Sequence, residues 1–281
     1  MLLQRIISAV VLIALLLVAA LWLPSGALVG ILVVIVVVGV VESSELLRKA
    51  GIDHVRNVAV AGAFVLIMGT WLTLLQTGAS GVADLELMVV FNYVLILFLI
   101  SLFRRAGNPY HLAGGGLLLF FYVPFLFNFL VKLLFEWDGN AEGRLLVVYL
   151  IGVVKSTDIG AYTVGSAVGR HKMFPRISPG KTWEGCAGGV ALAMAVSLGI
   201  RAGAGGDFGV VQLGWVDAAV LGLLLPVAGI LGDLVESMWK RHAGVKDSGT
   251  MIRGMGGVLD VIDSLLLASP VLYIYLRWLS I

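Results

Sequence analysis

The sequence has little of what a soluble protein places on its surface. Only 13% of its 281 residues are charged, whereas 60% are hydrophobic. A soluble domain of this size could not keep so much apolar surface away from water. It also has no polar stretch long enough for a separate soluble domain. Lipid is therefore the expected solvent for most of the chain, which we interpret as one integral membrane domain.

Cysteine is almost absent, since Cys186 is the only one. An intrachain disulfide and a cysteine-based metal site are therefore excluded. The net charge is only +2, and the Lys and Arg residues form no continuous block. Nucleic acid is accordingly not an expected partner.

Apolar runs recur from one end of the chain to the other, and a spanning helix needs about 20 mostly apolar residues. We expect an all-α fold, a polytopic transmembrane bundle of about nine spanning helices. The expected helices lie near residues 6–23, 27–41, 58–75, 87–102, 112–134, 145–165, 185–200, 215–236 and 258–279. The first run could be mistaken for a secretory signal, but its length and the apolar run after it favour a span.

The Lys and Arg residues are distributed unevenly over the connecting segments. With the N-terminus in the cytoplasm, most of them fall on the cytoplasmic side, as the positive-inside rule requires. The opposite connections, such as 76–86 and 201–207, are short and rich in Gly, Ala and acidic residues. Within the single domain 1–281 we separate N-terminal spans, about 1–140, from a C-terminal part, about 141–281, that holds the candidate catalytic residues.

Three of the expected helices carry ionisable residues at helical spacing, although charge within a span is costly. In the longest stripe the polar residues fall at i, i+3, i+4 and i+7, which places them on one face of a helix. The stripes are Asp233, Glu236, Ser237 and Lys240; Asp260, Asp263 and Ser264; and Lys155, Asp158 and Tyr162.

The acids of these stripes have two readings. One interpretation is that the acids form structural salt bridges. For Lys155 with Asp158, this interpretation is as well supported as a functional role. It is weaker for the acids of the other two stripes, because only Lys240 and Arg241 lie close by in sequence. A hard divalent cation resolves the surplus, and Mg²⁺ prefers carboxylate oxygens, whereas zinc would lack Cys and His partners. We predict Mg²⁺ bound by Asp233, Asp260, Glu236 and Asp263.

Two segments on the predicted cytoplasmic side combine cations with Gly and hydroxyl groups. Segment 169–185 also holds prolines, and segment 240–257 joins the two acid-bearing helices. Positive-inside topology alone would leave cations there, but together the segments suit a polyphosphate, because nucleotidyl transfer depends on positioning and charge stabilisation. The first segment is not a P-loop, since Pro175 stands where that motif requires Gly and no strand is expected before it.

Residues 237–263, SMWKRHAGVKDSGTMIRGMGGVLDVID, closely resemble the signature of the CDP-diacylglycerol synthase family, also called phosphatidate cytidylyltransferase. The family's S-x-x-K-R, K-D, G-G and D-x-x-D elements align without gaps. Residues 178–185, SPGKTWEG, look like its second characteristic stretch. The resemblance extends over the whole chain, because residues 4–6 and 42–51 are also of the family's type.

The resemblance implies an enzyme that converts phosphatidate and CTP into CDP-diacylglycerol and pyrophosphate, with Mg²⁺ and a nearby potassium ion. It implies that Asp233 and Asp260 hold metal while Asp263, Glu236 and Asp247 complete or support the shell. We expect a bacterial inner membrane, with the active site facing the cytoplasm. The sequence is compatible with a homodimer.

The residue types and the resemblance together give a set of candidate site residues. Catalytic roles are expected for Asp233, Asp260, Asp263, Lys181 and Lys246. Substrate binding is expected for Ser178, Arg170, Lys172, Thr182, Ser237, Lys240, Arg241, Asp247, Lys155 and Asp158.

Two positions depart from the family pattern. Met255 stands where a His usually precedes the paired glycines, and Val261 replaces the usual Arg between the two aspartates. Arg253, two residues before Met255, offers a compensating cation. These changes bear on the level of activity and the accepted lipid or nucleotide more than on the reaction class.

Two alternatives stay open. A CTP-dependent lipid kinase of the polyprenol type would release CDP instead of pyrophosphate. An ion-coupled transporter would use the intramembrane acids as a pathway. CDP-alcohol phosphotransferases are excluded, because the chain has no D-G-x-x-A-R element.

Overall fold

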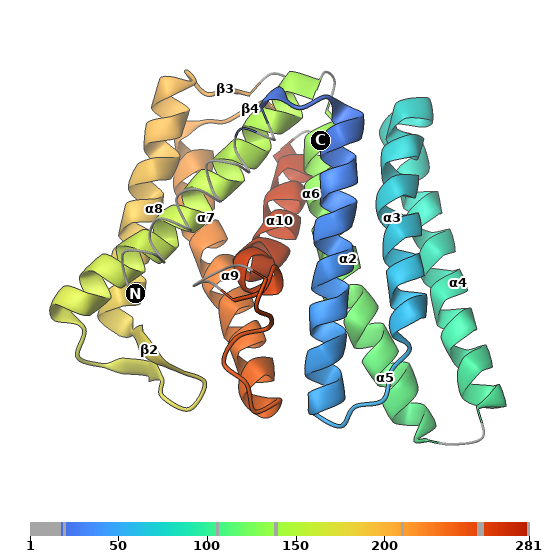
Figure 1. The fold of residues 1–281 in the computed structure, drawn as a ribbon. Helices are drawn as coiled ribbons and strands as arrows, with labels where there is room; N and C mark the ends of the chain where they lie inside the picture. The colour runs from blue at the N-terminus through green and yellow to red at the C-terminus, as the bar shows by residue number, and fades with distance from the viewer. Residues whose placement is uncertain are drawn as a thin grey trace. The chain divides into compact units, whose positions relative to one another are not determined.

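The computed structural model describes residues 18, 21–104, 107–137, 140–208, 211–251 and 256–279. These residues are mostly helical, which confirms the all-α membrane prediction (Figure 1). In them, seven stretches are long and apolar enough to cross a membrane, and one of these, Arg56–Phe103, contains two α-helices. The predicted span 6–23 lies almost wholly outside the described residues.

The chain forms two compact units that each combine segments distant in sequence. The first unit contains the residues up to Glu136 together with His242–Val261. The second contains Trp137–Arg241 together with Ile262–Ile281. The last helix begins in the first unit and continues in the second.

Helices that follow one another along the chain build most of the first unit. They are α2 (Ser25–Lys49), α3 (Arg56–Thr77), the 3-10 turn η1 (Gly78–Gly81), α4 (Val82–Phe103), α5 (Pro109–Phe120), the π-helical turn η2 (Phe121–Phe125) and α6 (Leu126–Phe135). Figure 1 shows α3 and α4 side by side. Their connection is shorter than the predicted 76–86, so Glu86 lies within α4.

The core of the first unit joins α4 to α5 through an aromatic contact. The rings of Tyr93 and Phe120 stack with their centroids 4.1 Å apart. The Tyr93 hydroxyl donates a hydrogen bond of 2.8 Å to the carbonyl of Gly116, so this buried polar group is satisfied. The π-helical turn that follows α5 contains Pro124, which has no N–H to donate and crowds the preceding turn of a regular helix.

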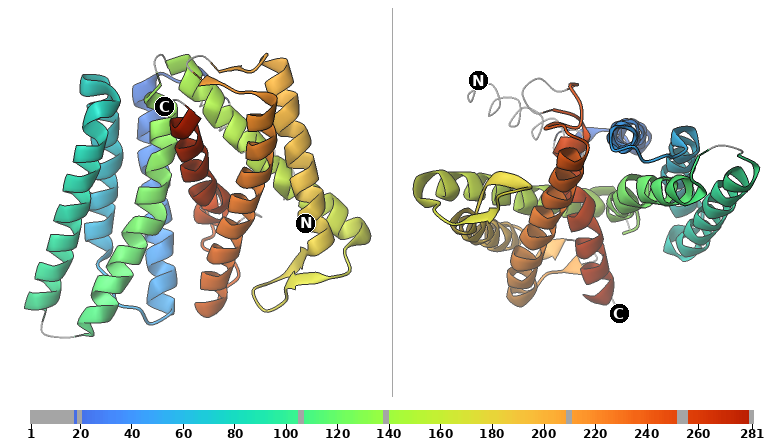
Figure 2. Two further views of the ribbon diagram at one scale, coloured as in Figure 1. Left: turned by 180° about the vertical axis from the view of Figure 1, so that it is seen from behind. Right: turned by 90° about the horizontal axis from the view of Figure 1, so that it is seen from below.

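Long helices and two short strand pairs build the second unit. They are α7 (Asn140–Val168), β1 (Lys172–Phe174), β2 (Ser178–Thr182), α8 (Trp183–Gly203), β3 (Asp207–Phe208), β4 (Val211–Gln212), α9 (Trp215–His242) and α10 (Leu259–Leu279). Figure 2 shows the β1–β2 hairpin at one end of this unit and β3 and β4 at the other.

Glycines bring α7 and α8 into close contact. A Cβ on Gly160 would lie 2.7 Å from the carbonyl oxygen of Gly188, and a Cβ on Gly189 would lie 2.7 Å from that of Thr157. Small residues let helix backbones approach in lipid, where apolar burial alone gives little drive for helices to associate.

Segment 169–185 contains an antiparallel hairpin, which its sequence did not predict. Lys172 of β1 pairs with Thr182 of β2, and Phe174 pairs with Ser178. Helix α9 extends beyond the predicted 215–236, so Lys240 and Arg241 lie in its last turns and not in a loop.

Candidate active site

A close approach of α9 and α10 builds the centre of the candidate site. A Cβ on Gly232 of α9 would overlap the backbone carbonyl of Asp263 in α10, and a Cβ on Gly229 would lie 3.6 Å from the Cβ of Ser264. Only glycine at position 232 permits this packing. The residues that follow Gly232 on α9 therefore lie directly beside Asp263.

Three carboxylates meet at this contact. One oxygen from each of Asp233, Glu236 and Asp263 lies within 4.8 Å of the others, and this is the one cluster of its kind in the described part of the chain. Glu236 is fully buried and Asp263 is 6% exposed. Like charges this close repel one another in a medium of low dielectric. A hard cation with oxygen ligands fits the set, and the absence of Cys and His from it disfavours zinc.

Two lysines partly neutralise the cluster. The ammonium of Lys181, on β2, lies 2.6 Å from Oδ2 of Asp233, and that of Lys240 lies 2.6 Å from Oε2 of Glu236. Ser237 donates a hydrogen bond of 3.1 Å to Oδ1 of Asp233. This confirms the predicted polar stripe on α9, and it adds Lys181 from a distant segment.

A third lysine lies on α7. The ammonium of Lys155 donates to the hydroxyl of Ser264 at 3.0 Å and lies 3.6 Å from Oδ2 of Asp158. The i, i+3 ion pair considered from sequence is therefore formed. With Asp158 included, four carboxylates share three lysines in this region, which leaves an excess of negative charge.

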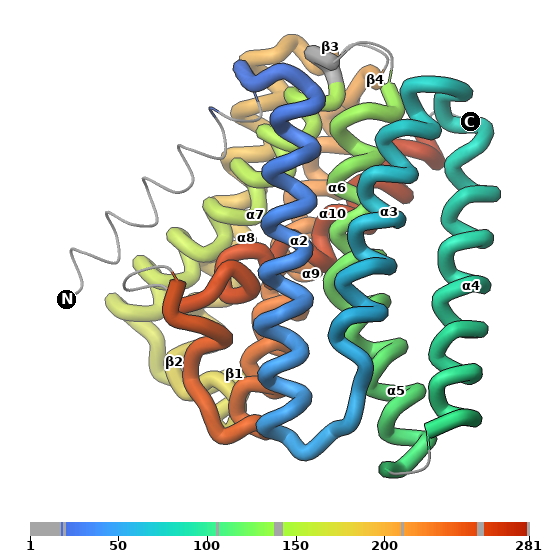
Figure 3. Tube along the Cα trace, turned by 45° about the vertical axis from the view of Figure 1, so that its right-hand side comes forward, coloured from blue at the N-terminus to red at the C-terminus, as the bar shows by residue number. Residues whose placement is uncertain are grey.

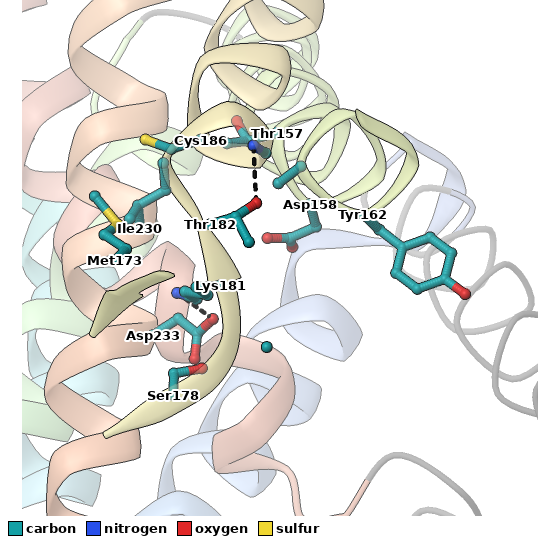
Figure 4. Close-up of a pocket in the computed structure, with 13 residues that line it drawn as sticks. Thr157, Asp158, Tyr162, Met173, Ser178, Lys181, Thr182, Cys186, Ile230 and Asp233 are labelled. Carbon is teal, nitrogen blue, oxygen red and sulfur yellow. Dashed lines mark hydrogen bonds and ion pairs between the residues drawn. The ribbon is translucent and has the colours of Figure 1, made fainter. Parts of the chain in front are cut away.

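A cavity of about 300 Å³ opens beside the cluster. It is lined by α7, the hairpin, α8 and α9, through residues that include Asp158, Ser178, Lys181, Thr182, Cys186 and Asp233. Figure 4 shows Lys181 pointing to Asp233 across the strand, with Asp158 and Tyr162 projecting from α7. Half of the residues in this list were predicted to bind substrate, and two to be catalytic.

Glu184, which was not predicted, ties the hairpin to α8. Its carboxylate accepts hydrogen bonds of 3.2 Å from the backbone N–H groups of Arg170 and His171, and lies 2.6 Å from Nδ1 of His171. At the end of β2, Thr182 caps α8 by accepting a bond of 3.1 Å from Gly185 N. Both anchors hold the strand that carries Lys181. The sequence signal that could have indicated Glu184 is an acidic residue in the first turn of a helix.

Asp260 is described in the first unit. Its Oδ2 accepts hydrogen bonds from Ser248 N at 2.9 Å, Ser248 Oγ at 2.7 Å and Gly257 N at 2.7 Å. Lys246 and Asp247, just before Ser248, are exposed. The structure thus brings Asp233, Glu236 and Asp263 together in one unit, whereas Asp260 and the Lys246 segment belong to the other.

The remaining predicted residues lie around the hairpin or outside the described chain. Arg170 and Lys172 are exposed at its start, and Arg241 donates a hydrogen bond of 3.2 Å to the carbonyl of Ile177 in the hairpin turn. Met255 and Arg253 lie outside the described residues. The catalytic and binding roles of all these residues stay predictions.

Comparison with known proteins identifies the family that this chain matches. The model of the cytidylyltransferase family matches residues 3–279. A phosphatidate cytidylyltransferase of Bacillus subtilis is 32% identical over 253 residues, which cover 88% of this chain and 89% of that protein. One of Staphylococcus saprophyticus is 35% identical over 201 residues, 72% of this chain and 73% of that protein. One of Brucella suis is 45% identical over 135 residues, 47% of each chain.

Proposed function

Because the chain belongs to the cytidylyltransferase family, we propose that it transfers the cytidylyl group of CTP to phosphatidate, which gives CDP-diacylglycerol and pyrophosphate. The observation that carries this proposal is the carboxylate cluster of Asp233, Glu236 and Asp263, joined to Lys181 at the edge of a cavity. A nucleoside triphosphate needs both kinds of charge, since a cation held by carboxylates and the lysines themselves can bind its phosphates.

The donor set of the cluster fits Mg²⁺, which we propose as the cofactor. Asp233, Glu236 and Asp263 would hold it, and Asp260 is the further ligand that the family resemblance implies. When bound, Mg²⁺ supplies positive charge that neutralises phosphate oxygens and orients them for displacement. We also propose, as the family resemblance implies, that a potassium ion is bound near the Mg²⁺.

The lysines supply the protein's own part of the chemistry. A phosphate oxygen of phosphatidate attacks the α-phosphorus of CTP in line, and the bond from that phosphorus to the bridging oxygen of the β-phosphate breaks. The nucleophile is already an anion and the leaving group departs as pyrophosphate, so no proton has to be removed by a base. The reaction needs positioning and cations, which is what Lys181 provides at the cavity and Lys240 provides beside Glu236.

We place the site on the cytoplasmic side of a bacterial inner membrane. The hairpin with Arg170, Lys172 and Lys181 and the last turn of α9 with Arg241 lie at one end of the second unit. A concentration of Lys and Arg favours the cytoplasmic side, where CTP is available.

The test is a transfer assay with membranes that contain the protein, phosphatidate, Mg²⁺ and CTP labelled in its α-phosphate. We expect the label in a CDP-lipid, release of pyrophosphate, and no product without phosphatidate. Release of CDP with a phosphorylated alcohol would favour the lipid kinase, and ion uptake into vesicles without CTP turnover would favour the transporter.

The metal assignment has its own test, with the Asp260→Asn variant. We expect this variant to lose transfer activity and to bind Mn²⁺, used in place of Mg²⁺ as a paramagnetic probe, more weakly than wild type. Normal turnover by Asp260→Asn would contradict its role as a ligand.

A further inference from the structure

A buried glutamate in α2 fastens the segment that precedes α10. Glu42 lies in the C-terminal part of α2, directly after its apolar run, and is 7% exposed. Its Oε1 accepts a hydrogen bond of 3.0 Å from Val258 N, and its Oε2 accepts one of 2.8 Å from Leu259 N. Leu259 is the first residue of α10. The carboxylate therefore satisfies N–H groups that a helix start leaves without intrahelical partners, and its charge suits the positive end of the helix dipole.

The backbone around this carboxylate is shaped to receive it. A Cβ on Gly249 would meet Oε1 of Glu42, and a Cβ on Gly257 would meet Oε2. Both glycines therefore let the chain approach the carboxylate more closely than any other residue would. Figure 3 shows the segment after α9 running beside α2. The contacts of Glu42 thus connect a helix from the start of the chain to residues more than 200 positions later.

The same segment holds Asp260. The hydroxyl of Ser248 lies 3.2 Å from Oε2 of Glu42 and 2.7 Å from Oδ2 of Asp260, so it joins the two carboxylates. Ser248 N and Gly257 N also donate to Asp260, and Gly257 is packed against Glu42. Removal of Glu42 would loosen Ser248 and Gly257, the two residues whose three donor groups orient Asp260.

We propose that Glu42 is a positioning residue for the transfer reaction: it fixes residues 248–249 and 257–259, and through them it orients Asp260 and the preceding Lys246 and Asp247. Glu42 acts through backbone N–H groups and Ser248, without touching substrate. This inference rests on the proposed function. It adds an element of the site that lies in the N-terminal part of the chain.

The test compares Glu42→Gln with Glu45→Gln, a matched control on the same helix. Gln has the shape of Glu, but its amide NH₂ would face one of the two backbone donors. Glu45 is on the exposed side of α2 and pairs with Arg48 at 2.6 Å. We expect kcat of Glu42→Gln to fall by about tenfold or more, the size of effect seen when a group that orients a ligand is removed. We expect KM for CTP to change far less, and Glu45→Gln to match wild type.

Hydrogen exchange gives a readout that does not depend on activity. Peptides covering 256–262 should exchange faster in Glu42→Gln, because one of Val258 N and Leu259 N loses its acceptor, and should be unchanged in Glu45→Gln. Glu42→Asp, which keeps the charge on a shorter side chain, should restore part of both signals. If Glu42→Gln does not fold, Ser248→Ala removes only the hydroxyl shared by the two carboxylates, and it should lower kcat in the same way.

The results distinguish a failure of the proposed function from a failure of the positioning role of Glu42. A wild-type protein without CMP transfer would defeat the proposed function itself. An active wild type with unchanged kcat in Glu42→Gln and Ser248→Ala would defeat the positioning role alone. A loss of kcat with unchanged exchange in 256–262 would exclude the route through Val258 N and Leu259 N. A loss that disappears when the assay temperature is lowered would show that Glu42 only stabilises the fold.

Discussion

Each of the two units buries carboxylates beside lysine, but the charge balance differs. In the first unit, Oε1 of Glu86 lies 2.9 Å from the ammonium of Lys132 and accepts a hydrogen bond of 2.8 Å from Asn128. Lys132 also lies over the ring of Phe129, 4.1 Å from its centroid. One acid meets one lysine in this pair, so its charge is neutralised within the protein.

In the second unit, the carboxylates outnumber the lysines and border a cavity. Lys181 pairs with Asp233 and Lys240 pairs with Glu236, and with Asp158 and Lys155 included four carboxylates share three lysines. A balanced pair inside a span satisfies itself, whereas an unbalanced cluster at a cavity is suited to an added cation and its anionic ligand. Charge balance, more than burial, therefore distinguishes a structural ion pair from a candidate site in this chain.

The largest effect should come from neutralising one acid of each region. Asp233→Asn should lower transfer activity by about a hundredfold or more, as when a group that stabilises transition-state charge is removed. Its thermal stability should stay near that of wild type, because the excess of negative charge falls. Glu86→Gln should do the reverse, since it removes the carboxylate 2.9 Å from the buried ammonium of Lys132 and should cost about 3 kcal/mol of unfolding free energy.

The measurements are the transfer assay and the melting temperature in detergent. Asp207→Asn, at an exposed carboxylate in β3, is the control for loss of a charge as such. Equal losses of stability in Asp233→Asn and Glu86→Gln would remove the distinction between the two regions.

A smaller effect should follow from pushing α9 away from α10. Gly232→Ala places a methyl group against the carbonyl of Asp263 and should separate Asp233 and Glu236 from it. We expect about a tenfold loss of activity, because a displacement of 1 Å in a reacting geometry can cost that much or more. Gly199→Ala is the matched control, because a Cβ there meets nothing within 4 Å. Similar activity in both variants would contradict the assigned packing.

The smallest effect requires no substitution. Cys186 is the only cysteine and lines the same cavity as Lys181 and Asp233, so its alkylation reports on what fills that space. CTP with Mg²⁺ should slow the labelling of Cys186 by a maleimide by about threefold, because a bound nucleotide would partly shield an accessible thiol. Inorganic phosphate at the same concentration should not slow it. Labelling unaffected by CTP in an active preparation would place the nucleotide elsewhere.

Local patterns in the sequence predicted much of this fold. Apolar runs gave the helices, and the i, i+3, i+4 and i+7 spacing placed Asp233, Glu236 and Lys240 on one face of α9, as the structure has them. The ends of helices were less predictable, because α9 continues through polar residues to His242 once tertiary contacts support it.

Contacts between distant segments could not be predicted in this way. The ion pair of Lys181 with Asp233 depends on a hairpin whose strands have only three and five residues, too short for an alternating pattern. The hydrogen bonds from Val258 N and Leu259 N to Glu42 depend on contacts between segments far apart in the sequence, which no periodic pattern encodes. The predicted partnership of Asp233 with Asp260 stays a prediction.

The π-helical turn Phe121–Phe125 sets the directions in which the side chains of the following helix, α6, point. A π turn holds one residue more than an α turn, so the following helix is rotated by about 100° relative to an uninterrupted one. Asn128 and Lys132 lie beyond this turn, and it is in the shifted phase that they face Glu86. An irregularity of the backbone, centred on one proline, thus selects which side of the helix carries its buried charge.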